Sequence, residues 1–131
     1  MDPSEFQTTL LNGFMDRLAK QCPEPSPETR LVMAIIKKAI QDVLFREQDW
    51  ERAVKITGKF SAGEIQNQVN ERLRWKKDAG DFLLGANDRL KLWTDGAGLD
   101  LQWVRDKIWK LLVVLRKEYR KQNARRVPKV A

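Results

Sequence analysis

Apolar residues recur every three or four positions along most of this 131-residue chain, the spacing that places side chains on one side of an α-helix. No segment shows the strong alternation of apolar and polar residues, with many β-branched side chains, that is typical of a strand. The sequence therefore predicts an all-α fold of five to seven helices. We expect one compact domain, residues 1–123, and a flexible, basic, disordered tail at 124–131.

The first expected helix runs from about Ser4 to Lys20, with its apolar residues on one stripe. Three prolines then fall within residues 22–27, and because proline fixes φ and lacks an N–H group, they predict a stiff linker. Ser26 before Pro27 is typical of a helix start, with a hydroxyl as N-cap and proline in the first turn. We expect this second helix to reach about Glu47.

Shorter helices are expected in the middle of the chain. Asp49 is positioned to cap a helix at 50–56, which a glycine ends. Ser61, followed three residues later by a glutamate, matches the capping box of another helix, which we expect to end at 72–77. The apolar residues 82–84 follow a glycine and are interpreted as a separate short piece.

The next segments are typical of a helix–glycine turn–helix unit. Asn87 or Asp88 is expected to cap a short helix, the glycine-rich turn 96–98 breaks it, and Asp100 caps a final helix reaching about 119–123. In DNA-binding helix-turn-helix proteins the second helix lies in the major groove. An ordinary helical hairpin has the same pattern and is the commoner outcome.

If the final helix reads bases, two side chains in its first turns suit adenine and guanine edges. These candidates are Gln102 and Arg105.

Charge is distributed unevenly along the chain. Residues 1–51 contain six basic and nine acidic side chains, whereas residues 52–131 contain 19 basic and nine acidic ones. Such polarity favours a polyanionic partner, because a local field can be stronger than the net charge of +7 implies. Two basic clusters are candidate nucleic-acid contacts. The alternative is a solvated helix end for the first cluster and a solubilising tail for the second. They are Arg72, Arg74, Lys76 and Lys77 with Trp75 among them, and Arg116, Lys117, Arg120, Lys121, Arg125 and Arg126.

The final helix is apolar on more than one side, which is typical of a helix that is central in a core or shared with another subunit. We expect a homo-oligomer whose interface uses the apolar residues outside the main apolar face. These are Trp103, Trp109, Val113 and Val114.

Several kinds of chemistry are excluded or disfavoured by composition. The chain has no histidine and one cysteine, Cys22, so it cannot form an internal disulfide, a Cys-His pair or a histidine-based zinc site. No phosphate-binding loop sequence is present. We expect no catalytic residues, no metal and no cofactor, and therefore no enzyme. The acidic N-terminus and the absence of a long apolar run indicate a cytoplasmic protein without a membrane segment.

Three segments share a pattern with known proteins: residues 75–85 (WKKDAGDFLLG), 92–105 (LWTDGAGLDLQWVR) and 39–42 (AIQD). They resemble a loose group of small proteins from tailed bacteriophages and prophages. The chain departs from that group at Thr94, where cysteine is frequent, and at Leu101, where proline is frequent. The resemblance implies a phage or prophage origin and a host bacterial cytoplasm, but no specific activity. From the uneven charge and the capped helix–glycine turn–helix pattern we expect a non-catalytic protein that binds double-stranded DNA, either a transcriptional regulator or a packaging accessory. The alternative is an inhibitor that binds a host defence protein, such as an anti-CRISPR.

Overall fold

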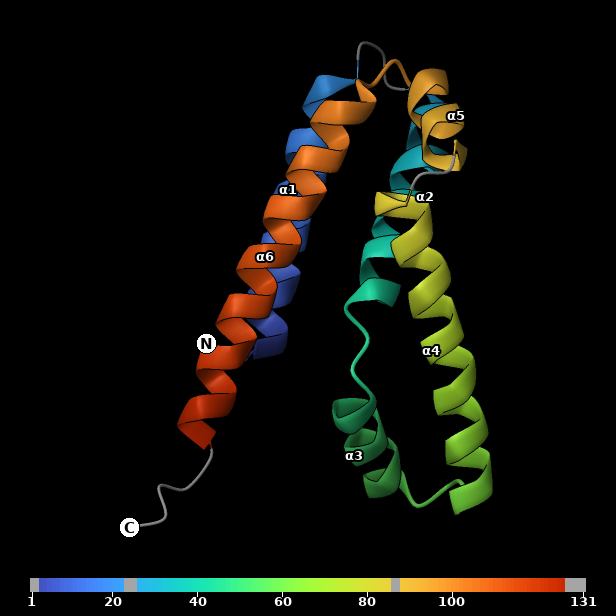
Figure 1. Ribbon diagram of the computed structural model, residues 1–131, viewed down its shortest axis with the longest axis vertical. Helices are drawn as coiled ribbons and strands as arrows, with labels where there is room; N and C mark the ends of the chain where they lie inside the picture. Colours follow the sequence, from blue (N-terminus) through green and yellow to red (C-terminus); the bar gives the residue numbers. More distant parts are fainter. Residues whose placement is uncertain (1–2, 23–25, 86–87, 127–131) are drawn as a thin grey trace. The chain divides into compact units, whose positions relative to one another are not determined.

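The computed structural model describes residues 3–22, 26–85 and 88–126, and over these residues the chain is helical without a strand (Figure 1). The predicted all-α fold class is therefore confirmed, and the six helices of the described residues lie within the expected number. The helices are α1 (Pro3–Gln21), α2 (Pro27–Val43), α3 (Glu47–Thr57), α4 (Ala62–Leu84), α5 (Arg89–Gly96) and α6 (Leu101–Arg126).

The chain divides into two compact units. One contains the residues up to Met33 and those from Lys91 onward, and the other contains Ala34 to Leu90. The boundaries fall inside α2 and α5, so these helices contribute to both units. The expectation of one domain over 1–123 stays a prediction.

In the first unit α1 and α6 lie side by side and run in opposite directions (Figure 1). Their apolar stripes explain this pairing, because each helix buries side chains spaced three or four residues apart. The buried residues of the two helices are Leu11, Phe14, Leu18, Val104, Ile108, Leu111, Leu112 and Leu115.

The start of α6 follows the sequence prediction. Gly98 adopts a left-handed conformation with φ 71°, which glycine tolerates without steric cost. The Asp100 carboxylate then accepts a hydrogen bond from the Trp103 amide at 2.9 Å, as expected for an N-cap.

The end of α6 differs from the expectation. The helix continues to Arg126 instead of ending at 119–123, so residues 124–126 are helical and not part of a disordered tail. Residues 119–126 contain neither glycine nor proline and are mostly good helix formers, so nothing stops the helix earlier. The rest of the expected tail, 127–131, lies outside the described residues.

In the second unit α3 packs against α4. The expected α2 boundary at Glu47 is wrong, because α2 ends at Val43 and Arg46 is an extended N-cap of α3. Glu47 and Asp49 instead occupy the first turn of α3, where carboxylates are stabilised by the helix dipole. The predicted helix end is confirmed, because Gly58 is a left-handed C-cap with φ 64°.

The helix α4 is longer than expected. Ser61 caps it as predicted, with its hydroxyl accepting from the Glu64 amide at 3.2 Å. It then passes the expected end at 72–77 and includes the apolar piece 82–84, ending at Gly85. Gly80 lies inside the helix, and burial of neighbouring Ala79 and Leu83 offsets its low helix propensity of about 1 kcal/mol.

Candidate functional site

The basic cluster of α4 is partly used for internal contacts. The Arg72 guanidinium carbon lies 5.2 Å from the ring centre of Trp50 and 5.9 Å from that of Phe45. It also lies 5.8 Å from the ring centre of Trp75 on its own helix. A cation within about 6 Å of aromatic rings is attracted by their quadrupoles. Arg72 therefore joins the link between α2 and α3, the start of α3 and the middle of α4.

Lys76 has a similar internal role. Its ammonium donates a hydrogen bond to the Phe45 carbonyl oxygen at 2.9 Å. Arg74 and Lys77, in contrast, are exposed. Only two of the four predicted cations of this cluster therefore lie fully on the surface.

Trp75 lies within the α4 cluster of candidate nucleic-acid contacts, where an exposed ring could stack on a base or sugar. Trp75 is 40% exposed. The Lys38 ammonium and the Arg72 guanidinium carbon each lie 5.8 Å from its ring centre. The ring thus already contacts two cations of its own unit, which leaves less of its surface for a ligand.

The basic cluster of α6 is arranged differently. Its four members within the described side chains are all exposed, on the side of the helix away from the buried residues. They are Arg116, Lys117, Arg120 and Lys121. Arg125 and Arg126 continue the same helix, and nothing more is described of their side chains. The α4 cluster lies in the second unit and the α6 cluster in the first.

The predicted helix–glycine turn–helix pattern is formed by α5, the turn that follows it and α6. The turn is closed by the Leu99 amide, which donates to the Thr94 carbonyl oxygen at 2.8 Å. In the first turns of α6 Gln102 is exposed, whereas Arg105 is half-buried. A half-buried guanidinium is less able to reach a base edge than a fully exposed one.

The expected interface residues of α6 fall into two groups. Trp109, Val113 and Val114 are 54%, 45% and 47% exposed. Trp103 is half-buried, and the Lys107 ammonium lies 5.8 Å from its ring centre. Three large apolar side chains thus remain on the surface of a helix that already buries another face.

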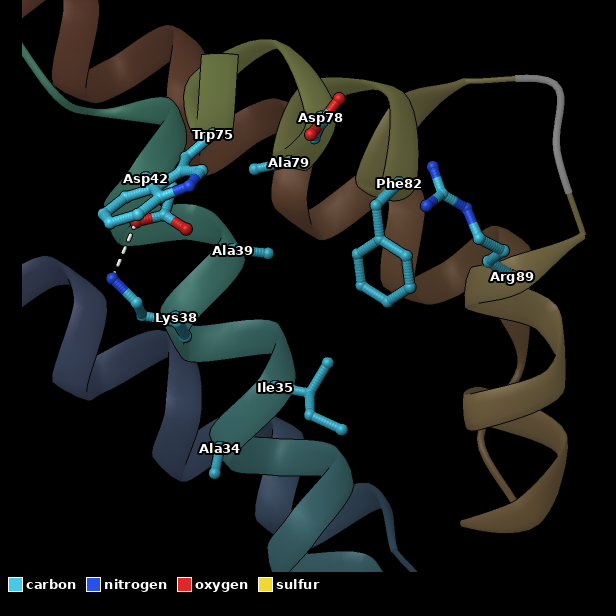
Figure 2. Close-up of a pocket in the computed structure, with 10 residues that line it drawn as sticks. All are labelled: Ala34, Ile35, Lys38, Ala39, Asp42, Trp75, Asp78, Ala79, Phe82 and Arg89. Carbon is cyan, nitrogen blue, oxygen red and sulfur yellow. Dashed lines mark hydrogen bonds and ion pairs between the residues drawn. The ribbon is translucent and has the colours of Figure 1, made fainter. Parts of the chain in front are cut away.

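A groove that the sequence does not predict lies between α2 and α4 within the second unit (Figure 2). It is open and has a volume of about 440 Å³. Its base contains the buried small residues Ala39 and Ala79, and the larger rings of Trp75 and Phe82 flank it. Its remaining lining residues are Ala34, Ile35, Lys38, Asp42, Asp78 and Arg89.

Charged groups surround this apolar base. Lys38 forms an ion pair with Asp42 at 2.8 Å, and the Arg89 guanidinium lies 6.0 Å from the Phe82 ring centre. The signal in the sequence is the spacing of Trp75, Ala79 and Phe82, which share one helix face only if α4 continues through residue 80. The helix end expected at 72–77 conceals this shared face.

The single cysteine lies at the end of α1. Burial raises the pKa of the Cys22 thiol, which donates a weak hydrogen bond to the Leu18 carbonyl oxygen at 3.6 Å. A raised pKa disfavours the reactive thiolate at neutral pH.

Metal binding and membrane crossing find no support in the described part of the chain. Within residues 3–22, 26–85 and 88–126 no three histidine, cysteine or acidic side chains gather in a way that could hold a metal ion. None of the helices in these ranges is long and apolar enough to cross a membrane.

Comparison of the chain with protein-family models, with curated proteins and with solved structures finds no match.

Proposed function

We propose that this chain is a non-catalytic protein that binds double-stranded DNA through the C-terminal half of α6. The observation that carries the proposal is the exposed basic cluster Arg116, Lys117, Arg120 and Lys121 on one continuous helix. Residues 91–131 contain 11 basic and four acidic side chains, whereas residues 34–90 contain 11 and nine. The excess of positive charge is thus concentrated where α6 lies.

The expected mode of binding is contact with phosphates. Each Lys or Arg that neutralises a phosphate releases counterions, so the affinity depends strongly on salt. Base reading by Gln102 and Arg105 is a lesser part of the proposal, because Arg105 is half-buried. The α4 cluster is a weaker candidate than α6, since Arg72 and Lys76 have internal contacts.

The biological role that we propose is that of a phage or prophage DNA-associated protein, a transcriptional regulator or a packaging accessory acting in the host cytoplasm. It rests on the resemblance of residues 75–85 and 92–105 to that group.

The test is binding to a labelled, unrelated duplex of about 30 base pairs, titrated with salt. The variant Lys117→Gln/Lys121→Gln removes two exposed cations of α6, and Lys55→Gln/Lys59→Gln removes two exposed cations elsewhere as the matched control. We expect the α6 variant to flatten the log–log salt slope by about 0.9 for each phosphate that is no longer neutralised, and the control to leave it unchanged. An equal effect of the two variants, or no binding at low salt, would reject the proposal.

A second candidate function is binding to a host protein, as in an inhibitor of a defence system. The observation that favours it is the exposed apolar group Trp109, Val113 and Val114 on α6. This candidate predicts a stoichiometric host partner in pull-downs and no duplex binding. A protein that binds the duplex and recovers no such partner would contradict it.

A further inference from the structure

One stripe of α6 has a regular pattern that phosphate binding does not explain. Six exposed residues are separated by four, three, four, three and four positions, the alternation that forms the contact line of a coiled coil. They fall within about 80° of the helix circumference, and the centre of this range lies about 120° from buried Ile108 and about 80° from buried Leu112. We call them the outer seam: Gln102, Asp106, Trp109, Val113, Arg116 and Arg120.

We propose that two copies of this chain associate through their outer seams, with the two α6 helices antiparallel. Each outer seam therefore contacts the outer seam of a second copy. A single register places Trp109 opposite Val113 of the second copy, and the two-fold axis repeats this pair. The same register places Asp106 opposite Arg116 and Gln102 opposite Arg120 of the second copy. All six seam positions of each chain are then paired.

Charge complementarity selects the orientation. The first half of the seam carries an acid, its centre is apolar, and its second half carries two arginines. In the antiparallel arrangement Asp106 of each copy meets Arg116 of the other, which gives two opposite-charge pairs. A parallel arrangement would place Asp106 against Asp106 and Arg116 against Arg116, and like charges in contact oppose pairing.

The contact that Asp106 already makes does not prevent this pairing. Lys110 and Asp106 form an ion pair at 3.0 Å, but their side chains are 64% and 53% exposed. An exposed pair of this kind at i, i+4 contributes little, so Asp106 can turn toward Arg116 of the second copy.

The four apolar residues of α6 expected at an interface do not all lie on the outer seam. Val114 is as exposed as Val113 but points about 100° away from it around the helix, outside the seam. Trp103 is also outside the seam and lies near Lys107. Lys117 and Lys121 flank the seam, so association leaves them available for phosphates. Arg116 and Arg120 belong both to the seam and to the basic cluster proposed to bind phosphates, so the dimer and DNA binding share these two side chains.

The first test uses two valines with nearly equal exposure. Sedimentation equilibrium of the full chain without DNA, over a concentration series, is expected to show a reversible dimer with twice the 15.3 kDa mass. Val113→Asp places a charge at the apolar centre and is expected to raise the dissociation constant by at least about tenfold. Val114→Asp adds the same charge outside the seam and is expected to leave the constant nearly unchanged. Circular dichroism verifies that both variants remain helical.

The second test exchanges the charges of the seam. Asp106→Arg and Arg116→Asp should each weaken self-association, because each creates two like-charge pairs in the antiparallel dimer. An equimolar mixture of these two variants should form a heterodimer at the affinity of the parent chain, because both pairs again have opposite charge.

Three outcomes would overturn the inference. The parent chain could stay monomeric up to hundreds of micromolar. Val113→Asp and Val114→Asp could weaken the dimer equally. The two charge variants could fail to associate with each other more tightly than with themselves. None of these measurements involves a duplex, so their failure is distinct from failure of the DNA-binding proposal.

Discussion

The ammonium of Lys76 donates a hydrogen bond to the main-chain oxygen of Phe45, 31 residues earlier in the sequence, at 2.9 Å. Phe45 lies in the short link between α2 and α3, beyond the last turn of α2. A carbonyl group there has no partner within a helix, so the lysine satisfies it from α4. Together with the contact of Arg72, this bond fixes the α2–α3 link to α4.

Lys76→Met should therefore destabilise the fold. The variant keeps much of the side-chain length but removes the donor, and a hydrogen bond from a charged group contributes about 1.5–3 kcal/mol. Urea unfolding followed by circular dichroism measures the change. Lys77→Met, at the neighbouring exposed position, is the control and should change stability by less than about 0.5 kcal/mol. Equal effects of the two substitutions would show that the bond to Phe45 contributes nothing.

Arg72 should likewise matter for stability more than for DNA binding. Its guanidinium lies within 6 Å of the ring centres of Phe45, Trp50 and Trp75, so Arg72→Gln should destabilise by about 1–2 kcal/mol. Arg74→Gln removes the same charge from an exposed position of α4 and should be nearly neutral. Both should alter the affinity for a duplex much less than Lys117→Gln/Lys121→Gln does. A large loss of duplex affinity in Arg72→Gln with unchanged stability would restore the α4 cluster as the binding surface.

Asp100→Ala should weaken α6 at its first turn. The carboxylate caps the helix by accepting from the Trp103 amide, and loss of such a cap costs about 1 kcal/mol. Asp95→Ala, at an exposed residue of α5, is the matched control. Urea midpoints for the two variants test the expectation, which is rejected if Asp95→Ala is as destabilising as Asp100→Ala.

Cys22 should react slowly in the folded protein. Burial raises the pKa of its thiol, so at a given neutral pH less thiolate is present than in the unfolded chain. Iodoacetamide should modify the native protein more slowly than the urea-unfolded protein at the same pH. Because burial disfavours the thiolate, the pKa of the thiol is higher in the folded than in the unfolded chain. The free energy of unfolding is therefore highest below the pKa of the unfolded thiol and falls as pH rises through the pKa of the folded thiol. Equal alkylation rates in the two states would contradict this expectation.

The capping residues are the most predictable part of the fold. Ser61, Gly58 and Asp100 act locally, through groups within three or four residues, so their roles follow from the sequence alone. The end of α2 and the start of α3 are misplaced in the prediction because their contacts with Arg72 and Lys76 come from a distant helix. A local sequence pattern cannot predict contacts between residues that are far apart in the chain.

The candidate surfaces also differ in whether local sequence patterns or long-range contacts determine them. The exposure of the α6 cluster could be predicted, because helical spacing places it opposite the apolar face. The internal use of Arg72 could not, since its partners Phe45 and Trp50 are separated from it by more than 20 residues. The groove escapes prediction for a third reason, because the sequence predicts a helix end at 72–77 and a separate short piece at 82–84, whereas α4 is continuous through both.

Gly80 and Gly58 provide a final prediction, because alanine should have opposite effects at the two positions. A Cβ atom would meet nothing within 4 Å at either glycine, so steric contact cannot explain a difference. Gly80 lies inside α4, where Gly80→Ala should stabilise by about 0.5–1 kcal/mol by lowering the entropy of the unfolded chain. Gly58 has φ 64°, where an alanine is strained, so Gly58→Ala should destabilise by about 1 kcal/mol. Urea unfolding of both variants gives the two signs directly. Destabilisation by Gly80→Ala would mean that α4 is interrupted at residue 80, and the groove formed by Trp75, Ala79 and Phe82 would then not exist.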